Sequence, residues 1–394
     1  MFTYVDSDKS AKIKVIGVGG AGGNAINNMI ESKLRGVKFI AANTDAQALE
    51  ISQAPVKLQI GEKLTAGLGA GADPQVRYEA ALENEESIRQ NLEGSHMVFI
   101  TAGLGGGTGT GAAPLIAKIC KDMGILTVAV VTKPFSFEGR KRALLAEKGL
   151  NELKQTADTV ITIPNDRLRG LATKNAKLVD MFKKADEILL HSVKGITDLI
   201  IMPGLVNLDF ADVRTTMSKA GMAIMGIGVG QGENRAIEAA ERAISHPLLE
   251  DISIAGAKGV LINITSASDL TMEEMTEASE RIYNEVGEDA EIIWGTVIED
   301  SLGSEMRVTV IATGIGSGDT PSRIEPLGET PLRGRIRDIT PADVNSAIDL
   351  EEPTYMRRLR ATEESSSTHY QGFKGIVLDS DDLDTPTFLR RKAD

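Results

Sequence analysis

Cysteine, histidine and aromatic residues are scarce in this sequence of 394 residues, which has one cysteine, four histidines and 4% aromatics. The single thiol, Cys120, excludes a disulfide framework and a cysteine-based metal cluster. The histidines lack the spacing of a metal-ligand set, which argues against a zinc site. No apolar run approaches the roughly 18 residues that span a bilayer, and the first residues do not resemble a signal peptide. These absences predict a soluble, cytoplasmic protein without membrane insertion.

Positive charge is also in short supply, because 43 lysines and arginines face 56 aspartates and glutamates, giving a net charge of −13. This balance disfavours nucleic acid and anionic membrane surfaces as partners. The chain is 42% apolar and long enough for about two or three domains with a sizeable core.

The composition changes near Gly316, because six of the thirteen prolines lie in residues 317–394 together with a serine-rich run. We therefore predict a disordered linker over 317–379. Apolar residues regroup at the C-terminal end, which predicts a separate peptide over 380–394. Residues 1–11 are expected to be a flexible N-terminus.

Short apolar runs alternate with helical patterns over residues 12–174. The predicted strands are 12–18, 37–43, 97–103, 125–131 and 159–164, and the predicted helices are 24–33, 74–92, 108–123 and 137–156. Alternation of apolar strands with helices is typical of an α/β, Rossmann-like domain whose parallel sheet is covered on both faces.

A long helix is predicted over 175–203, apolar on nearly every face and therefore buried between two layers. Residues 204–316 follow as a smaller α+β domain with a mixed sheet. Its predicted helices are 209–220, 233–245 and 271–286, and its predicted strands are 222–229, 258–265, 291–299 and 306–313. We expect the last two strands to pair as a closing hairpin.

Two glycine-rich loops each connect a predicted strand to a helix. The first runs from Gly17 to Asn24 and fits G-x-G-x-x-G, with Asp45 about where a ribose-binding acid would lie in a dinucleotide enzyme. The second runs from Gly103 to Gly111. Backbone amides at such turns bind phosphate, so two of them in one sheet predict a polyphosphate held from two sides. No Walker-type lysine motif is present, so threonine hydroxyls at Thr108 and Thr110 would replace the lysine.

The G-G-G-T-G-T-G motif together with the first loop resembles the tubulin/FtsZ family, and the resemblance covers residues 12–316 and the last sixteen residues. It implies a GTPase that assembles head-to-tail into filaments of the bacterial division ring at mid-cell, with GTP or GDP as ligand and Mg²⁺ bound mainly through the phosphates. No protein metal site is implied. The implied nucleotide-binding residues are Gly20, Ala21, Gly22, Gly23, Asn24, Ala70, Gly71, Gly103, Gly106, Gly107, Thr108, Gly109, Thr110, Glu138, Arg142, Asn165, Phe182 and Asp186.

Phe182 and Asp186 also make a physical case, because positions i and i+4 share one face of a helix. One carboxylate can accept both N–H groups of the guanine edge, while adenine would leave it unpaired. Asp73 stands where the family commonly has asparagine, and the simpler reading of Asp73 is an N-cap of the helix that begins at Pro74.

Asn207, Asp209 and Asp212 resemble the family's catalytic loop. Asp209 and Asp212 can share one helical face, although N-capping is the better reading of Asp209 alone. The long helix would place them roughly 40 Å from the phosphates of their own chain. The resemblance implies that they complete the site of the next subunit.

The tail DDLDTPTFLRRKAD resembles the family's peptide for membrane tethers and other division proteins, with Leu383, Phe388 and Leu389 as apolar anchors. Two other functions remain open at this point. One is a dinucleotide-dependent oxidoreductase built on the first loop, and the other is a tubulin-like scaffold that binds GTP without hydrolysing it.

Overall fold

The computed structural model describes residues 11–65, 74–171, 177–202, 204, 208–219, 221–249, 254–287 and 290–315. All of them belong to one compact unit, Met1–Arg323. The predicted segments 1–10, 317–379 and 380–394 lie outside the described residues.

The described residues form a ten-stranded sheet in the order β3-β2-β1-β4-β5-β6-β7-β10-β8-β9. The strands are β1 (Ile13–Val18), β2 (Val37–Asn43), β3 (Val56–Gln59), β4 (Met97–Gly103), β5 (Leu126–Lys133), β6 (Thr159–Pro164), β7 (Gly221–Gln231), β8 (Gly259–Ser266), β9 (Glu291–Ile298) and β10 (Glu305–Ile315). The first seven strands in this order, from β3 through β2 and β1 to β7, pair in parallel. Strand β7 continues the sheet from β6 into the second half of the chain.

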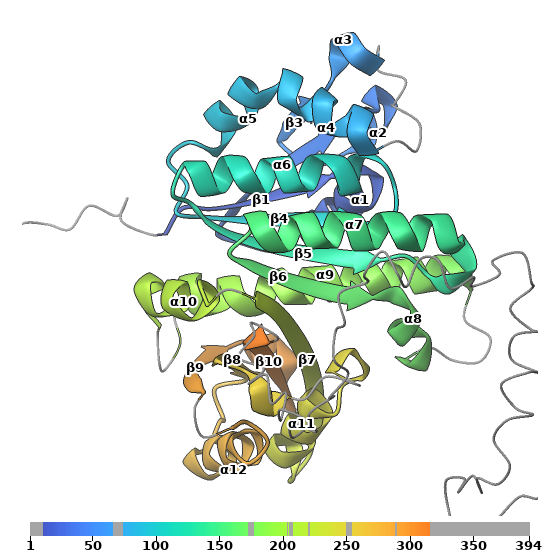
Figure 1. Ribbon diagram of the computed structural model, residues 1–394. Coiled ribbons are helices and arrows are strands. Elements are labelled where there is room, and N and C mark those ends of the chain that lie inside the picture. Colours follow the sequence, from blue (N-terminus) through green and yellow to red (C-terminus); the bar gives the residue numbers. More distant parts are fainter. Residues whose placement is uncertain are drawn as a thin grey trace, which may run out of the picture. The chain divides into compact units, whose positions relative to one another are not determined.

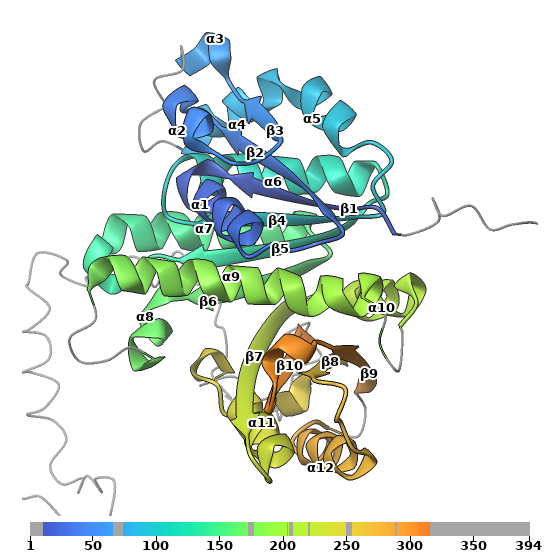
Figure 2. The same ribbon diagram turned by 180° about the vertical axis from the view of Figure 1, so that it is seen from behind.

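Helices cover both faces of the parallel half of the sheet (Figures 1 and 2). They are α1 (Gly19–Glu31), α2 (Ala46–Ile51), α3 (Glu62–Thr65), α4 (Pro74–Glu83), α5 (Glu85–Leu92), α6 (Thr108–Asp122), α7 (Arg140–Thr156), α8 (Asn165–Leu168) and α9 (Leu178–Ile201). Helices α4 to α7 lie on one face, and α1 and α9 lie on the other. The predicted α/β class with a parallel sheet is confirmed.

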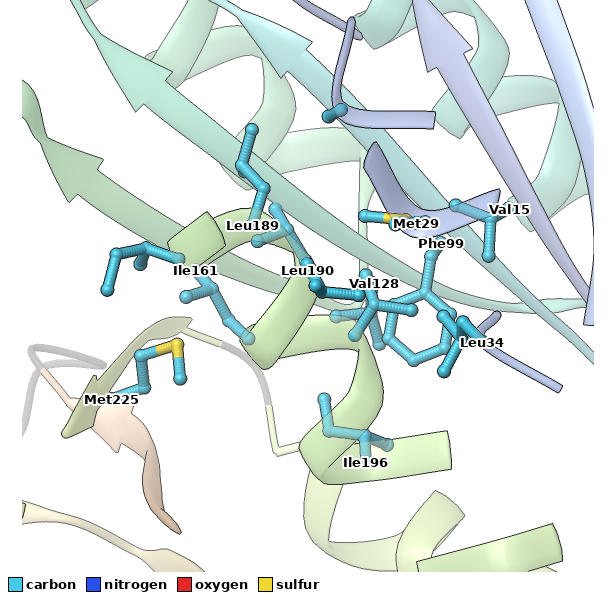
Figure 3. Close-up of a cluster of buried hydrophobic side chains, with 14 of the residues drawn as sticks. Val15, Met29, Leu34, Phe99, Val128, Ile161, Leu189, Leu190, Ile196 and Met225 are labelled. Atoms are coloured by element: carbon cyan, nitrogen blue, oxygen red, sulfur yellow. The ribbon is translucent and has the colours of Figure 1, made fainter. Parts of the chain in front are cut away.

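Each face of the sheet has its own apolar core, because successive residues of a strand point to opposite faces. Phe99 of β4 packs in the cluster beneath α1 and α9, while Ile100 packs in the cluster beneath α6 and α7. Figure 3 shows residues of the first cluster, in which Leu190 of α9 is drawn beside Val128 and Phe99 of the sheet. Strands buried on both faces explain the continuous apolar runs in the sequence.

The second half of the sheet is mixed, and it carries α10 (Phe210–Met217), α11 (Arg235–Ile244) and α12 (Met272–Tyr283). Strand β10 lies antiparallel between β7 and β8, and β9 pairs in parallel with β8. The expected hairpin of 291–299 with 306–313 is therefore wrong. The two strands follow each other in the chain, but β8 separates them in the sheet.

Helix α9 crosses between the two halves and contacts both, yet its first turns are less buried than the sequence predicted. Leu178 and Val179 are 54% and 62% exposed, and Phe182 is 42% exposed. The expectation of burial on every face is wrong for this end of the helix, whereas residues from Ile188 onward are largely buried. None of the described helices combines the length and the hydropathy that crossing a membrane requires.

Candidate functional site

The main candidate site is a cavity of about 340 Å³ at the carboxyl ends of β1, β4, β5 and β6, closed on one side by the N-terminal half of α9. In doubly wound sheets, this edge is where ligands bind. Its lining residues are Val18, Gly19, Gly20, Ala21, Asn24, Gly103, Leu104, Gly106, Gly107, Thr108, Gly109, Thr132, Pro134, Glu138, Arg142, Asn165, Phe182, Ala185, Asp186 and Leu189.

The first glycine loop is shorter than the sequence suggested, because α1 begins at Gly19 and not near Asn24. Its glycines have two different surroundings. A Cβ atom at Gly22 would lie 2.4 Å from the carbonyl oxygen of Thr101, so this glycine lets α1 pack against β4. A Cβ atom at Gly20 would meet nothing within 4 Å. Gly20 lines the cavity, so a side chain at this position would enter open space.

The second loop leads from β4 into α6 and is held by threonine side chains. The amide of Gly105 donates to Oγ1 of Thr110 over 2.9 Å, and the hydroxyls of Thr108 and Thr44 lie 3.0 Å apart. Gly106 has open space where a Cβ would be. The first amides of α6 are left without intrahelical partners, and together with the helix dipole they favour an anion at this end of the cavity.

A third segment, after β5, closes the cavity from the side. Glu138 accepts a hydrogen bond from the amide of Phe135 over 3.0 Å and forms an ion pair with Arg142. Phe135 is buried, and its ring meets the ring of Phe182 edge to face at 5.5 Å. This contact ties the segment to α9.

Two residues of the far wall, Asn165 and Asp186, offer hydrogen-bonding groups to a planar ligand, and Phe182 offers an aromatic ring. Asn165 is buried, and its Oδ1 has no hydrogen-bond partner among the described residues. Burial raises the pKa of Asp186 to about 7. A buried polar atom without a partner costs free energy unless a ligand or water satisfies it. Phe182 lies one turn before Asp186 and presents a partly exposed ring.

Most of the predicted nucleotide-binding residues line this one cavity, and three of the described ones do not. Gly22 lies under the loop, Gly23 lines a neighbouring cavity of about 150 Å³, and the Thr110 hydroxyl braces Gly105. Ala70, Gly71 and Asp73 lie outside the described residues. The prediction missed Val18, Gly19, Leu104, Thr132, Pro134, Ala185 and Leu189. The first three lie within the two glycine loops, so the motifs could have marked them, whereas the other four lie outside both loops.

Asp45 was the acid expected to bind ribose in a dinucleotide enzyme, but its carboxylate caps a helix of its own chain. Its Oδ1 accepts the amide hydrogens of Gln47 and Ala48 over 2.9 and 3.4 Å, which makes it the N-cap of α2. It does not line the cavity. The acid that a dinucleotide-dependent oxidoreductase would need, Asp45, is therefore used as a helix cap.

The predicted catalytic aspartates lie at the opposite end of α9, as Figures 1 and 2 show by the position of α10. Asp209 is the N-cap of α10, and its Oδ1 accepts the amide hydrogen of Asp212 over 2.9 Å. The capping interpretation of Asp209 is confirmed. The side chain of Asp212 is exposed and has no hydrogen bond or ion pair with any described residue. Asn207 lies outside the described residues.

Among the described residues, no group of three or more histidine, cysteine, aspartate or glutamate side chains could hold a metal ion.

Comparison with known proteins decides among the possible ligands. Residues 12–173 match the model of the tubulin/FtsZ family GTPase domain, and residues 221–316 match that of the FtsZ family C-terminal domain. The chain belongs to the tubulin/FtsZ family. It therefore carries a GTPase domain, and the protein is a GTPase that binds guanine nucleotide.

Individual relatives agree with this assignment to the tubulin/FtsZ family. The chain is 50% identical to the cell division protein FtsZ of Coxiella burnetii over 388 residues, covering 98% of this chain and 97% of that protein. It is 48% identical to the FtsZ of Pseudomonas putida, with full coverage of both. An empty FtsZ dimer from M. jannaschii superimposes with a TM-score of 0.76 at 47% identity, covering 79% of this chain and 90% of that one. A GTPγS-bound CetZ2 protofilament from Haloferax volcanii, 19% identical with a TM-score of 0.67, covers 78% of this chain and 94% of that one and shares the fold.

Proposed function

We propose that the chain binds GTP in the 340 Å³ cavity, with the phosphates at the two glycine loops and the base against α9. The observation that carries this proposal is the convergence of both helix N-termini, Asn165 and Asp186 on one cavity. Gly20, Ala21, Asn24 and Gly106–Gly109 line the cavity and would bind the phosphates, with Gly22, Gly23, Gly103 and Thr110 shaping the two loops around them. Ala70 and Gly71 are proposed for the γ-phosphate on the family resemblance alone.

The sugar and the base are assigned by the chemistry of the walls. Glu138 and Arg142 would bind the ribose, because they lie between the phosphate loops and α9 on the cavity wall. Asp186 would accept the two N–H groups of the guanine edge, Phe182 would cover the face of the base, and Asn165 would supply an additional hydrogen bond. Mg²⁺ bound to the phosphates would neutralise part of their charge.

Hydrolysis is proposed to need a second chain. Asp186 and the last residue of α9, Ile201, are fifteen positions apart, or about 22 Å along the helix axis. Asp212 therefore lies too far away to act in its own cavity. We propose that Asn207, Asp209 and Asp212 reach the cavity of the next subunit in a head-to-tail filament and orient the attacking water. Such a heterologous contact does not close on itself, which supports open polymerisation.

We propose a role in bacterial cell division for this filament, at mid-cell, as the names of the relatives suggest. The proposed organisation is a GTP-binding domain over 12–174, a central helix over 175–203, an activation domain over 204–316, a linker over 317–379 and a partner-binding peptide over 380–394. Division proteins and membrane tethers would bind that peptide. Neither nucleic acid nor direct membrane insertion is part of the proposal.

One experiment tests the proposed function as a whole. Purified protein is mixed with GTP, ATP or NAD, and nucleotide binding, phosphate release and light scattering are followed together. We expect binding, phosphate release and scattering with GTP alone. Binding of NAD, or phosphate release that never brings a rise in scattering at any protein concentration, would contradict the proposal.

The raised pKa of Asp186 makes a prediction about pH. Guanine needs the ionised carboxylate, so GTP affinity is expected to fall about tenfold from pH 8 to pH 6 as a carboxyl with a pKa of about 7 gains its proton. Asp186→Ala should weaken GTP binding by about 1–3 kcal/mol at pH 8 and should give a flatter profile. Calorimetric titration of both proteins across this range checks both results. An equally steep profile in the variant would assign the titration to another group.

The same shift has a consequence for the nucleotide-free protein. The pKa of Asp186 in the folded protein is raised above its value in the unfolded chain, so the native state holds the proton more tightly. The free energy of unfolding is therefore expected to fall as pH rises from about 4 to about 7. Substitution by alanine should remove that part of the pH dependence of unfolding.

Removal of residues 380–394 is expected to leave GTP turnover and assembly nearly unchanged while abolishing binding to membrane tethers. A proposed linker of more than sixty residues (317–379) separates this peptide from the folded part. Turnover, light scattering and co-sedimentation with a tether are measured on the full-length and the truncated protein. Loss of GTPase activity on truncation would assign these residues to the enzyme.

A further inference from the structure

Asp166 lies next to the cavity without lining it. It is the second residue of α8 and directly follows Asn165, whose side chain does line the cavity. Its carboxylate oxygens Oδ1 and Oδ2 accept the amide hydrogen of Ser136 over 3.0 and 3.1 Å, and Oδ1 also accepts the Ser136 hydroxyl over 3.1 Å. One side chain of α8 thus holds the segment that follows β5.

Ser136 lies at the centre of the segment that shapes the ribose wall. The residue before it, Phe135, packs its ring against Phe137 at 5.0 Å and against Phe182 at 5.5 Å. Two residues after it, Glu138 bonds back to the Phe135 amide and pairs with Arg142. The position of Ser136 therefore fixes both the aromatic support of Phe182 and the direction of the Glu138 carboxylate.

The same segment also packs on the second glycine loop. A Cβ atom at Gly105 would lie 2.8 Å from the carbonyl oxygen of Arg142 and 3.0 Å from Cγ of Pro134. Gly105 has a φ of +93°, which only glycine adopts readily. A displacement of the segment would consequently move the phosphate loop as well as the ribose wall.

We infer that Asp166 is a positioning residue of the nucleotide site, which fixes the segment from Pro134 to Arg142 through Ser136. This inference rests on the proposed binding of GTP in the cavity. It assigns to Asp166 an effect on nucleotide affinity and not on the chemical step, because the proposed catalytic aspartates lie at the other end of α9. Asp166 is exposed, so the role depends on its three hydrogen bonds acting together on one residue, each to a charged acceptor.

The chain offers a matched control for the same kind of contact. Asp158 directly precedes β6, and its Oδ2 accepts the amide hydrogen of Thr127 in β5 over 2.8 Å. It therefore makes the same kind of contact between β5 and the chain next to β6, but at the amino-terminal ends of these strands and outside the cavity lining. A merely structural role would make Asp158→Ala and Asp166→Ala behave alike.

The test measures the affinities for GTP and GDP, the turnover at saturating GTP and the melting temperature for five variants of the full chain. Asp166→Ala is expected to weaken both nucleotides about five- to twentyfold, with turnover at saturation within about twofold of the unchanged protein. Asp166→Asn keeps one acceptor oxygen and should recover most of the affinity. Asp158→Ala should lower the melting temperature and leave the affinities unchanged.

The fourth variant, Ser136→Ala, and the double variant of Ser136→Ala with Asp166→Ala complete a double-mutant cycle for the hydroxyl contact, because alanine keeps the backbone amide. If this contact contributes, the effects on affinity are expected to be non-additive, with Ser136→Ala weaker than Asp166→Ala. Unchanged affinity in Asp166→Ala, or an equal loss in Asp158→Ala, would overturn the inference. If the unchanged protein binds no GTP at all, the proposed function itself fails, and this result is distinct from the previous two.

Discussion

Replacing Asp212 with asparagine is expected to lower GTP turnover per chain by about 10²- to 10³-fold, the usual scale for losing a group that orients or deprotonates a nucleophile. GTP affinity should stay unchanged, because Asp212 does not line the cavity of its own chain. Turnover and nucleotide binding are measured on the same preparations. A parallel fall in affinity would show that the substitution disturbs the nucleotide site instead.

The neighbouring aspartate provides the control. Asp209 caps α10 through the amide of Asp212, whereas the carboxylate of Asp212 is free of hydrogen bonds and ion pairs within the part of the chain that the structure describes. Asp209→Ser keeps a capping oxygen and removes the charge. If Asp209 is only a cap, this variant should hydrolyse GTP at nearly the original rate. A large loss would assign its carboxylate to the reaction as well.

A mixing experiment tests whether the site is shared between two chains. Asp212→Asn lacks the catalytic face, and Arg142→Ala is impaired on the face that binds nucleotide, so co-assembly of the two creates some junctions with both faces intact. Partial recovery of turnover in the mixture is expected, together with a threshold in protein concentration for the unchanged enzyme. Full turnover per chain in dilute solution below that threshold would contradict catalysis in trans.

The arrangement of the site could be predicted from the sequence largely because each predicted group follows a strand of one parallel sheet. The carboxyl ends of β1, β4, β5 and β6 meet at a single edge, so motifs far apart in the chain were expected to converge. The i, i+4 spacing of Phe182 and Asp186 likewise put both on one face of α9. Such local patterns predict the positions of side chains because they depend only on the geometry of helices and parallel strands.

The order of β8, β9 and β10 in the sheet could not be predicted from the sequence in the same way. β9 and β10 follow each other along the chain, and a short connection usually indicates a hairpin. β10 is buried along nearly its whole length and takes a central position between β7 and β8, whereas β9 begins with exposed or half-buried residues and forms the edge. Strand order thus followed the burial of each strand in the sheet.

The glycine loops show a further limit of sequence reasoning, because identical residues have opposite roles. A run of glycines predicts a phosphate site, but it does not tell which glycine faces the ligand. Gly22 is needed for contact between α1 and β4, while Gly20 and Gly106 face open space. Only the distances from each position to its neighbours separate packing from binding.

These distances lead to opposite expectations for two alanine substitutions in the first loop. In Gly22→Ala, the new methyl group would lie 2.4 Å from the Thr101 carbonyl oxygen and 2.8 Å from the Gly17 carbonyl carbon, both backbone atoms that cannot turn aside. Helix α1 would have to move away from the sheet, at a cost of about 1–3 kcal/mol of unfolding free energy, as in other overpacked cores. Nucleotide affinity should fall together with stability.

In Gly20→Ala, the methyl group meets no protein atom within 4 Å, so the free energy of unfolding should stay the same or rise by roughly 0.5–1 kcal/mol through the better helix propensity of alanine. The same methyl group would occupy the space through which a phosphate approaches the amides of α1. GTP affinity should then fall about ten- to a hundredfold, the equivalent of one hydrogen bond to a charged group. Urea unfolding without nucleotide and titration with GTP separate the two effects. Gly20→Ala that binds GTP normally would place the phosphates elsewhere, because the added methyl group would stand in the part of the cavity that Gly20 lines.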